Sequence, residues 1–532
     1  MLRPIDRKPQ VTAVTRPGVL AGCAVILGLV IALVPQVELA TALATALALG
    51  AIAAIFHEPV LGLALALVAG PFQPLERISL HLGLDSGQIV LGITLVSYLA
   101  RALATRRMPI ARTYLPLTLA LALFIIVCLV SFLPARDLIA WANECIKWLQ
   151  VLVIALLVMN ERDGRKRAFL IGAILLSGAG QAMYGIVQAD VRGFGPREFQ
   201  VLGSKTNFRA YGTFEQPNPF GGYMGLVWPL AASVALGALV ELLIDPVGRA
   251  RTVVSKLALA VIAVGIATMC LVALIASGSR GAEIGAMAAV VTMALVLLKH
   301  PWRWVGALAL AGLLLAGLHV VNIPLALDAQ VQEILALDVR DAHILPTTFS
   351  TIERLAHWQA AVRMIQANPW LGVGFGNYEA TYPDYKLFIW DNALGHAHNY
   401  YLNIFAETGV IGLVAYFALW GTVFVAAWRF VRQAQIPAHL SLDRVLWSRL
   451  TSKRPQPLEW ERRKNEARRE IDRVRAASLA VGLLGAFAHV SCHHVFDDLY
   501  VANIHVLIGV YLGLLGTLWL ERKRKSATII PP

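Results

Sequence analysis

The chain has 532 residues, of which 58% are hydrophobic and 15% are charged. Soluble domains usually have about a quarter charged residues, so this composition excludes a soluble protein. The formal net charge is +13. The five cysteines are scattered and form no C-x-x-C pair, which argues against both a disulfide framework and a cysteine-based metal knuckle.

Apolar runs recur along the whole chain, and most are long enough to cross a hydrocarbon core of about 30 Å as a helix. The predicted spans, in chain order, are 18–34, 37–56, 59–72, 87–104, 114–133, 138–159, 168–189, 217–243, 256–277, 281–298, 303–321, 403–428, 476–496 and 500–520. Because 59–72 is short enough to be re-entrant and 138–159 contains Glu144 and Lys147, the count stays at about 12–14. We therefore predict an all-α fold, a polytopic transmembrane helical bundle in which residues 1–532 form a single integral membrane domain.

The loops between the predicted spans differ strongly in basic residues. The N-terminus, the segment 429–475 and the C-terminal tail are all rich in Lys and Arg, and they fall on one side of the membrane. Cytoplasmic loops carry such an excess, so both termini are predicted to be cytoplasmic and 429–475 to be a basic cytoplasmic helical insert. Residues 322–402 then form a large extracytoplasmic (periplasmic) loop between the spans near 321 and 403. The net positive charge is explained by the Lys and Arg residues of the predicted cytoplasmic loops, which also attract membrane lipids. It therefore predicts no nucleic-acid partner.

Basic residues on the predicted outer face oppose this charge bias, and those singled out are Arg192, Arg197, Lys205, Arg209, Arg280, Arg354 and Arg363. Arg280 interrupts two apolar runs in S-G-S-R-G, next to the N-terminus of the following helix. A guanidinium beside a helix N-terminus suits a phosphate or pyrophosphate. The alternative is that Arg280 pairs with Glu283 or with a loop carboxylate. Tyr211 and Phe214, close to Arg209, are predicted to be aromatic residues of the membrane interface.

A titratable group stands where the long outer loop meets the next span, in the stretch Gly395–Gly412. It contains His396, His398 and Glu407. Histidine can act as a general base near neutral pH without a perturbed pKa, so His398 is a candidate base. The alternative is a purely structural role for the two histidines. Glu407 is expected to cap a helix or to form a pair with another side chain rather than to catalyse.

The last outer turn reads H-V-S-C-H-H-V-F-D-D, with His489 and His493 four residues apart and Asp497 and Asp498 nearby. Such a group can hold a metal ion. No paired-carboxylate or H-E-x-x-H signature accompanies it, so we expect a polar patch where helices meet and predict no metal site.

Several of these stretches together resemble the O-antigen ligase and polymerase superfamily of bacterial envelope glycosyltransferases. The strongest is H-N-Y-Y-L-N-I-F-A-E-T-G-V-I-G, in which His398, Asn399, Gly409 and Gly412 match the ligase pattern. The others are E-R-L-A-H-W…N-P-W-L-G-V-G-F-G-N-Y, R-A-Y-G-T-F-E-Q-P-N-P-F-G-G-Y, S-G-S-R-G-A and H-V-F-D-D. The resemblance covers roughly residues 170–515, and the basic segment 429–475 departs from a minimal ligase, which leaves the subfamily open.

The resemblance implies transfer of a glycan from an undecaprenyl-pyrophosphate donor to the hydroxyl of a glycan or lipid acceptor. It also implies a metal-independent inverting reaction without a cofactor, on the outer face of the bacterial inner membrane. Arg209 and Arg280 would bind the pyrophosphate, and His398 would deprotonate or orient the acceptor hydroxyl. The supporting residues would be Asn399, Arg354, His396, Glu407 and Asp497.

Alternatives stay open both within this class of enzyme and outside it, where a solute transporter and a purely structural scaffold are the other classes. Within the class, the protein can be a ligase, a polymerase or a protein O-oligosaccharyltransferase. Outside it, a membrane solute transporter would need ionisable residues in mid-span, for which Glu144 and Lys147 are the candidates. The sequence does not determine the oligomeric state.

Overall fold

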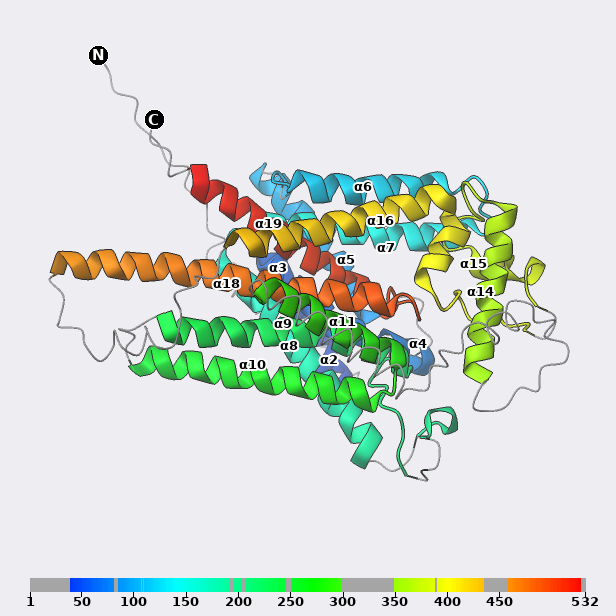
Figure 1. Ribbon diagram of the computed structural model, residues 1–532, viewed down its shortest axis with the longest axis horizontal. Helices are drawn as coiled ribbons and strands as arrows, with labels where there is room; N and C mark the ends of the chain where they lie inside the picture. The colour runs from blue at the N-terminus through cyan, green and yellow to red at the C-terminus, as the bar shows by residue number, and fades with distance from the viewer. Residues whose placement is uncertain are drawn as a thin grey trace, which may run out of the picture. The chain divides into compact units, whose positions relative to one another are not determined.

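The computed structural model describes residues 39–80, 85–106, 108, 110–191, 195–201, 204, 206–244, 250–298, 349–387, 390–434 and 457–527 (Figure 1). These residues form helices and connecting loops, with one isolated bridge between Gln200 and Phe208. The predicted all-α fold is therefore confirmed. The predicted spans 18–34 and 303–321 lie outside the described residues, as does 435–456 of the predicted insert.

The helices follow one another in this order: α2 (Leu39–His57), α3 (Pro59–Ala69), η1 (Gly70–Phe72), α4 (Gln73–Leu80), α5 (Ser86–Thr105), α6 (Leu115–Val130), α7 (Leu138–Asn160), α8 (Gly164–Ile186), η2 (Val187–Val191), η3 (Arg197–Phe199), α9 (Pro217–Ile244), α10 (Ala250–Ala276), α11 (Arg280–Leu297), α14 (Phe349–Ala367), α15 (Tyr378–Thr381), η5 (Tyr382–Asp384), α16 (Tyr400–Ala434), α18 (Pro457–His493) and α19 (Ile504–Ala527).

The described residues divide into two compact units. The smaller lies within 1–65 and 89–107, and the larger within 66–88 and 108–532. In the smaller unit, the Ser97 hydroxyl donates to the Ile55 carbonyl oxygen at 2.9 Å, and Arg101 lies 3.9 Å from Glu58. The candidate site belongs entirely to the larger unit.

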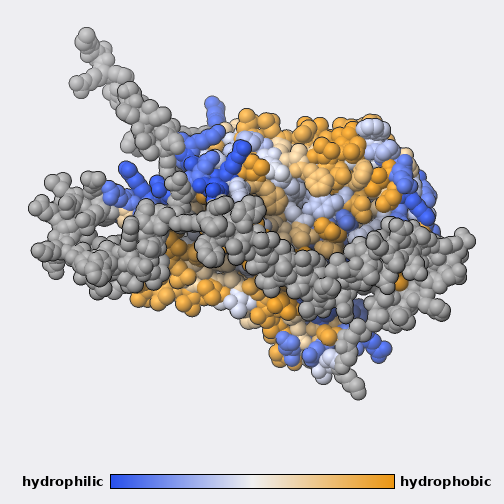
Figure 2. Space-filling model, viewed as in Figure 1, coloured by the Kyte–Doolittle hydropathy of each residue, from blue (hydrophilic) through white to orange (hydrophobic). Residues whose placement is uncertain are grey.

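Ten helices of the described residues are long and apolar enough to cross a membrane, and α2 and α6 each contain a shorter apolar helix. On α6 the exposed side chains include Leu119, Leu123 and Ile126, which share one helix face. Leucine and isoleucine at more than half exposure along a helix face require an apolar environment such as lipid. On the face drawn in Figure 2, apolar side chains gather between two sets of hydrophilic ones. The chain is a multi-pass membrane protein.

Small residues let the helices of the larger unit approach closely. Helix α9 packs against α10 and α18, and α19 packs against α7. A Cβ atom at Gly225 of α9 would lie 1.8 Å from the His489 ring of α18, and one at Gly513 of α19 would lie 2.6 Å from Val158 of α7. Small residues are frequent at helix contacts in lipid, where close packing replaces the hydrophobic effect as the driving force.

Tyr211 and Phe214 are not interface aromatics, as the sequence had indicated, because both are buried. They are 7% and 2% exposed. Tyr211 packs on Phe199, and Phe214 packs on Phe220 and Tyr223. The Pro-Asn-Pro turn after Phe214 begins α9 and folds these rings inward, so they serve as core residues of the loop before α9.

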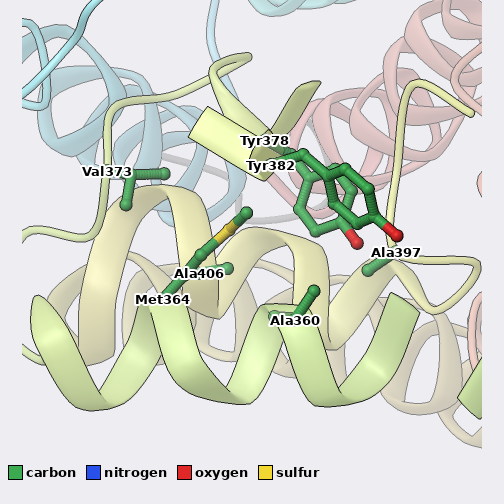
Figure 3. Packing of buried hydrophobic residues seen from close by; sticks show 8 residues of the cluster. Ala360, Met364, Val373, Tyr378, Tyr382, Ala397 and Ala406 are labelled. Atoms are coloured by element: carbon green, nitrogen blue, oxygen red, sulfur yellow. The ribbon is translucent and has the colours of Figure 1, made fainter. Parts of the chain in front are cut away.

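Helix α14 runs across the ends of the neighbouring helices of the larger unit and packs on α16 (Figure 1). It ends at Ala367, just before Asn368 and Pro369, because the residue before a proline disfavours the helical conformation. Together with α15 and η5 it forms a layer that we call the cap, residues 349–387 and 390–399. The cap has its own apolar core, in which the rings of Tyr378 and Tyr382 lie 5.7 Å apart above Met364 (Figure 3).

Candidate functional site

The first turn of α16 explains why Asn399 directly follows His398 in the motif. The Asn399 side chain accepts a hydrogen bond from the Leu402 backbone N–H at 3.1 Å, which is the bond of a helix N-cap. Directly before this cap, His398 has a positive φ of 51°, a conformation that costs a non-glycine residue free energy. The Ala397 backbone N–H donates to Asn403 at 3.1 Å and helps to hold the turn. Backbone strain of this kind is often found at functional sites.

A second segment reaches the same place from the far end of α18. The Tyr400 backbone N–H donates to the His494 carbonyl oxygen at 2.8 Å, which joins the start of α16 to the turn after α18. This turn brings Asp497 to the two histidines. Asp497 Oδ1 lies 3.5 Å from His396 Nε2 and 3.6 Å from His398 Nδ1. Residues almost one hundred positions apart thus form one His-His-Asp group.

One hydrogen bond fixes the position of the proton on His396. His396 Nδ1 accepts the His398 backbone N–H at 3.0 Å, so the His396 proton sits on Nε2 and faces Asp497. When His398 also presents its Nδ1–H to Asp497, its Nε2 is left with a free lone pair. This nitrogen is buried and has no hydrogen-bond partner among the described residues, so it is free to accept a proton from a group that enters the site. A carboxylate that orients one nitrogen of a histidine and leaves the other free is the arrangement of a general base.

The electrostatics support these protonation states. Burial lowers the pKa of His396 to about 4, although the Asp497 charge opposes that shift, so His396 is neutral at pH 7. Burial would raise the pKa of Asp497, but the His398 and His396 imidazoles that face the carboxylate hold this pKa well below its usual range. Asp497 is therefore a buried anion that faces two imidazoles.

Three arginines gather beside this group. Arg209, in the loop before α9, donates from Nε to the Ser277 carbonyl oxygen at 2.7 Å and from Nη2 to Asn218 Oδ1 at 3.1 Å. Arg280 is the first residue of α11, follows the N-cap Ser279 and is exposed. Burial and then the charges of Arg354 and Arg280 lower the pKa of Arg209, which places all three cations near one another.

The predicted alternative for Arg280, pairing with Glu283 or a loop carboxylate, is not seen in the described part of the chain. There, no carboxylate lies within 4.0 Å of the guanidinium of Arg209, Arg280 or Arg354. Three like charges without a carboxylate partner, one of them at a helix N-terminus, are an arrangement that suits an anion.

Residues 264–417 match the family model described as O-antigen ligase. The resemblance to the O-antigen ligase and polymerase superfamily is confirmed. Within this O-antigen ligase segment lie Arg280, Arg354 and His398, whereas Arg209 and Asp497 lie outside it. A search of curated proteins finds no match. The family match supports an enzyme of the ligase or polymerase type in polysaccharide biosynthesis.

Glu407 has a structural position in the ligase segment. Its side chain accepts the Tyr378 backbone N–H at 3.1 Å, and its carbonyl oxygen accepts the Gly374 N–H at 2.9 Å. These bonds dock the glycine-rich loop 371–376 onto α16, which breaks at Gly409 (φ 66°, ψ −171°). A Cβ atom at Gly409 would lie 2.1 Å from the Trp370 carbonyl oxygen, so the motif glycine is required by the close contact of two backbones.

Sequence reasoning missed His357 and Glu353 of α14. The rings of His357 and His398 have centroids 5.5 Å apart, and His357 Nδ1 lies 3.2 Å from the Tyr378 hydroxyl. Burial raises the pKa of Glu353, while the charges of His398 and Arg354 oppose this shift. Both residues stand in the E-R-L-A-H-W stretch, one helical turn apart and on the Arg354 side of the helix, and this i, i+4 spacing was the available signal.

His396, His398 and Asp497 each present a ligand atom within 4.8 Å of the others, so together they can hold a metal ion. The predicted alternative metal pair, His489 and His493, is not part of this group. Instead the His489 ring fills the space between Gly225 and Gly285. In α7, Lys147 forms an ion pair with Glu144, so these two mid-span charges neutralise each other.

Proposed function

We propose that the protein transfers a glycan from undecaprenyl pyrophosphate to an acceptor hydroxyl on the outer face of the bacterial cytoplasmic membrane. The observation on which this rests is the pairing of His398 with Asp497 beside three arginines that have no carboxylate within 4.0 Å in the described residues. One half of the site suits the removal of a proton, and the other half suits the stabilisation of a departing anion.

In the proposed reaction, His398 Nε2 takes the proton of the acceptor hydroxyl as its oxygen attacks the anomeric carbon. The bond between that carbon and the pyrophosphate oxygen breaks, and undecaprenyl pyrophosphate leaves with the electron pair. Attack from the face opposite the leaving group inverts the anomeric configuration. Asp497 stabilises the imidazolium that forms on His398, and His396 keeps the Asp497 carboxylate in place.

Arg209, Arg280 and Arg354 have the other role. As the glycosyl bond breaks, negative charge builds up on the pyrophosphate, and guanidinium groups bind such oxygens through two parallel hydrogen bonds. Arg209 is already fixed by its bonds to Ser277 and Asn218, so little reorganisation is needed. Arg280 is exposed and is expected to turn onto the donor when it binds. In this proposal the three cations supply the charge stabilisation that a metal ion supplies elsewhere.

The central experiment measures glycan transfer by purified protein in nanodiscs, with an undecaprenyl-pyrophosphate glycan as donor. His398→Ala should abolish transfer but leave donor binding intact, because the base acts on the acceptor. Arg280→Ala should weaken donor binding and lower kcat/KM about 10-fold to 100-fold. This is the effect on the rate of losing one or two hydrogen bonds to a charged group. Arg363→Ala, an exposed arginine of α14, is the matched control.

Full activity in both His398→Ala and Arg280→Ala would exclude this assignment. Loss of transfer after EDTA treatment, with recovery on adding back a divalent metal, would instead show that the His-His-Asp group holds a metal. Acceptor assays with lipid A, with free repeat units and with a peptide then separate a ligase, a polymerase and a protein O-oligosaccharyltransferase.

A further inference from the structure

An open groove lies between α6, α16 and α19 of the larger unit, far from the candidate site. Its volume is about 570 Å³, within the range of about 300–1,000 Å³ typical of small-molecule sites. Its wall on α16 includes the apolar Ala418, Gly421, Val425 and Ala426 together with Thr422, and Val425 is 47% exposed. A Cβ atom at Gly421 would meet no atom within 4 Å. The groove therefore has an apolar wall with room for an extended apolar chain.

One end of the groove is cationic and aromatic. Arg429 and Lys523 line it there, together with the stacked rings of Tyr114 and Trp519, whose centroids are 5.4 Å apart. Within the described residues neither Arg429 nor Lys523 has a carboxylate within 4.0 Å. Tyrosine and tryptophan rings of this kind mark the headgroup level of a membrane.

The groove lies at the opposite end of α16 from the His-His-Asp group. The part of α16 between its break at Gly409 and Arg429 has a length of about 30 Å at 1.5 Å per residue. This is about the thickness of a hydrocarbon core, so the groove's cationic end and the candidate site belong to different leaflets. The groove is thus separate from the site of glycan transfer.

We infer that this groove binds an anionic phospholipid, with its phosphate between Arg429 and Lys523 and one acyl chain along Gly421 and Val425. A soluble anion would leave the apolar wall uncovered. A second copy of the chain, packed around a two-fold axis, would bring the same cations toward one another. Basic pockets between membrane helices with an apolar continuation fit anionic lipids, which supply both the charge and the chain.

The test reconstitutes the full-length protein in nanodiscs of equal phosphatidylglycerol and phosphatidylcholine and measures the retained lipids by native mass spectrometry. The wild-type protein should retain phosphatidylglycerol selectively. Arg429→Gln with Lys523→Gln should lower that selectivity about tenfold or more, since each cation near a phosphate contributes separately. Gly421→Leu should fill the groove and lower the retention of both lipids.

The matched control removes two exposed cations outside the groove, Arg432→Gln with Arg469→Gln, and should keep the wild-type selectivity. Equal phosphatidylglycerol retention in the groove variant and this control would overturn the inference. So would a protein dimer that Gly421→Leu abolishes, because the groove would then be occupied by a second copy. Gly421→Leu introduces no clash at its Cβ, so a loss of lipid in that variant reports occupancy of the groove.

Discussion

Replacing Asp497 by Asn removes the charge of the His-His-Asp group while keeping its shape. Asp497 Oδ1 accepts the Asp498 backbone N–H at 3.0 Å, and an amide oxygen can accept the same bond. The loss is therefore mainly the attraction between the carboxylate and the imidazolium that forms on His398. The two groups lie 3.6 Å apart, and the Asp497 side chain is only 8% exposed.

At an effective dielectric constant of about 20, unit charges at this distance attract by about 4–5 kcal/mol. Each 1.36 kcal/mol of transition-state stabilisation changes the rate about tenfold, so kcat should fall by about 10³-fold. Donor binding should change little, because the arginines are untouched. The pKa of Asp497 lies well below its usual range, so the wild-type charge is present throughout the working pH range.

The assay compares kcat and donor affinity of Asp497→Asn with those of the wild-type protein in the same nanodiscs. Asp391→Asn is the control, because Asp391 is an exposed carboxylate of the cap that pairs with Lys386. Equal thermal unfolding temperatures would show that the fold is intact. A kcat within threefold of the wild-type value, at an unchanged unfolding temperature, would refute the role of Asp497.

Three further predictions concern stability and positioning. His396 has a pKa lowered from 6.5 to about 4, so the unfolded chain takes up its proton first as the pH falls. The contribution of neutral His396 to the free energy of unfolding is complete above pH 6.5. Between that pH and pH 5, the free energy of unfolding of the wild-type protein should fall by about 2 kcal/mol more than that of His396→Gln, measured by thermal unfolding. Gly409→Ala should destabilise the protein by about 2 kcal/mol or more in the same measurement, because φ is 66° and a carbonyl oxygen lies 2.1 Å from the new Cβ. His357→Phe should keep the ring packing but lower kcat about tenfold, because the bond to a tyrosine hydroxyl is lost and His398 is held less well.

Matched variants control each of these. His57→Gln changes an exposed histidine and should leave the pH dependence unaltered. Gly421→Ala places a Cβ where nothing lies within 4 Å and should be neutral or slightly stabilising. Equal pH profiles for the His396 and His57 variants, or equal stabilities for the Gly409 and Gly421 variants, would contradict the reasoning. A His357→Phe enzyme with unchanged kcat would leave His357 as a packing residue only.

The sequence alone determined most of the helical frame. A run of apolar residues predicts a membrane helix because hydrophobicity and helix length are local properties, and α7, α9 and α11 begin within one residue of their predicted starts. The end of α14 before Asn-Pro and the ion pair of Glu144 with Lys147 also depend on residues that are close in the sequence. The arginines on the predicted outer face could be singled out because they oppose a charge bias that is readable along the chain.

Only the tertiary structure decided what these residues do together. His398 and Asp497 meet because a backbone hydrogen bond joins Tyr400 to His494, and no local pattern encodes that contact. His357 reaches His398 only because α14 lies across α16. Gly409 is needed where two backbones touch, a distance that exists only in the folded chain. Contacts between distant segments depend on how all the helices pack at once, so the sequence indicated the candidate residues, and the fold assembled them into one site.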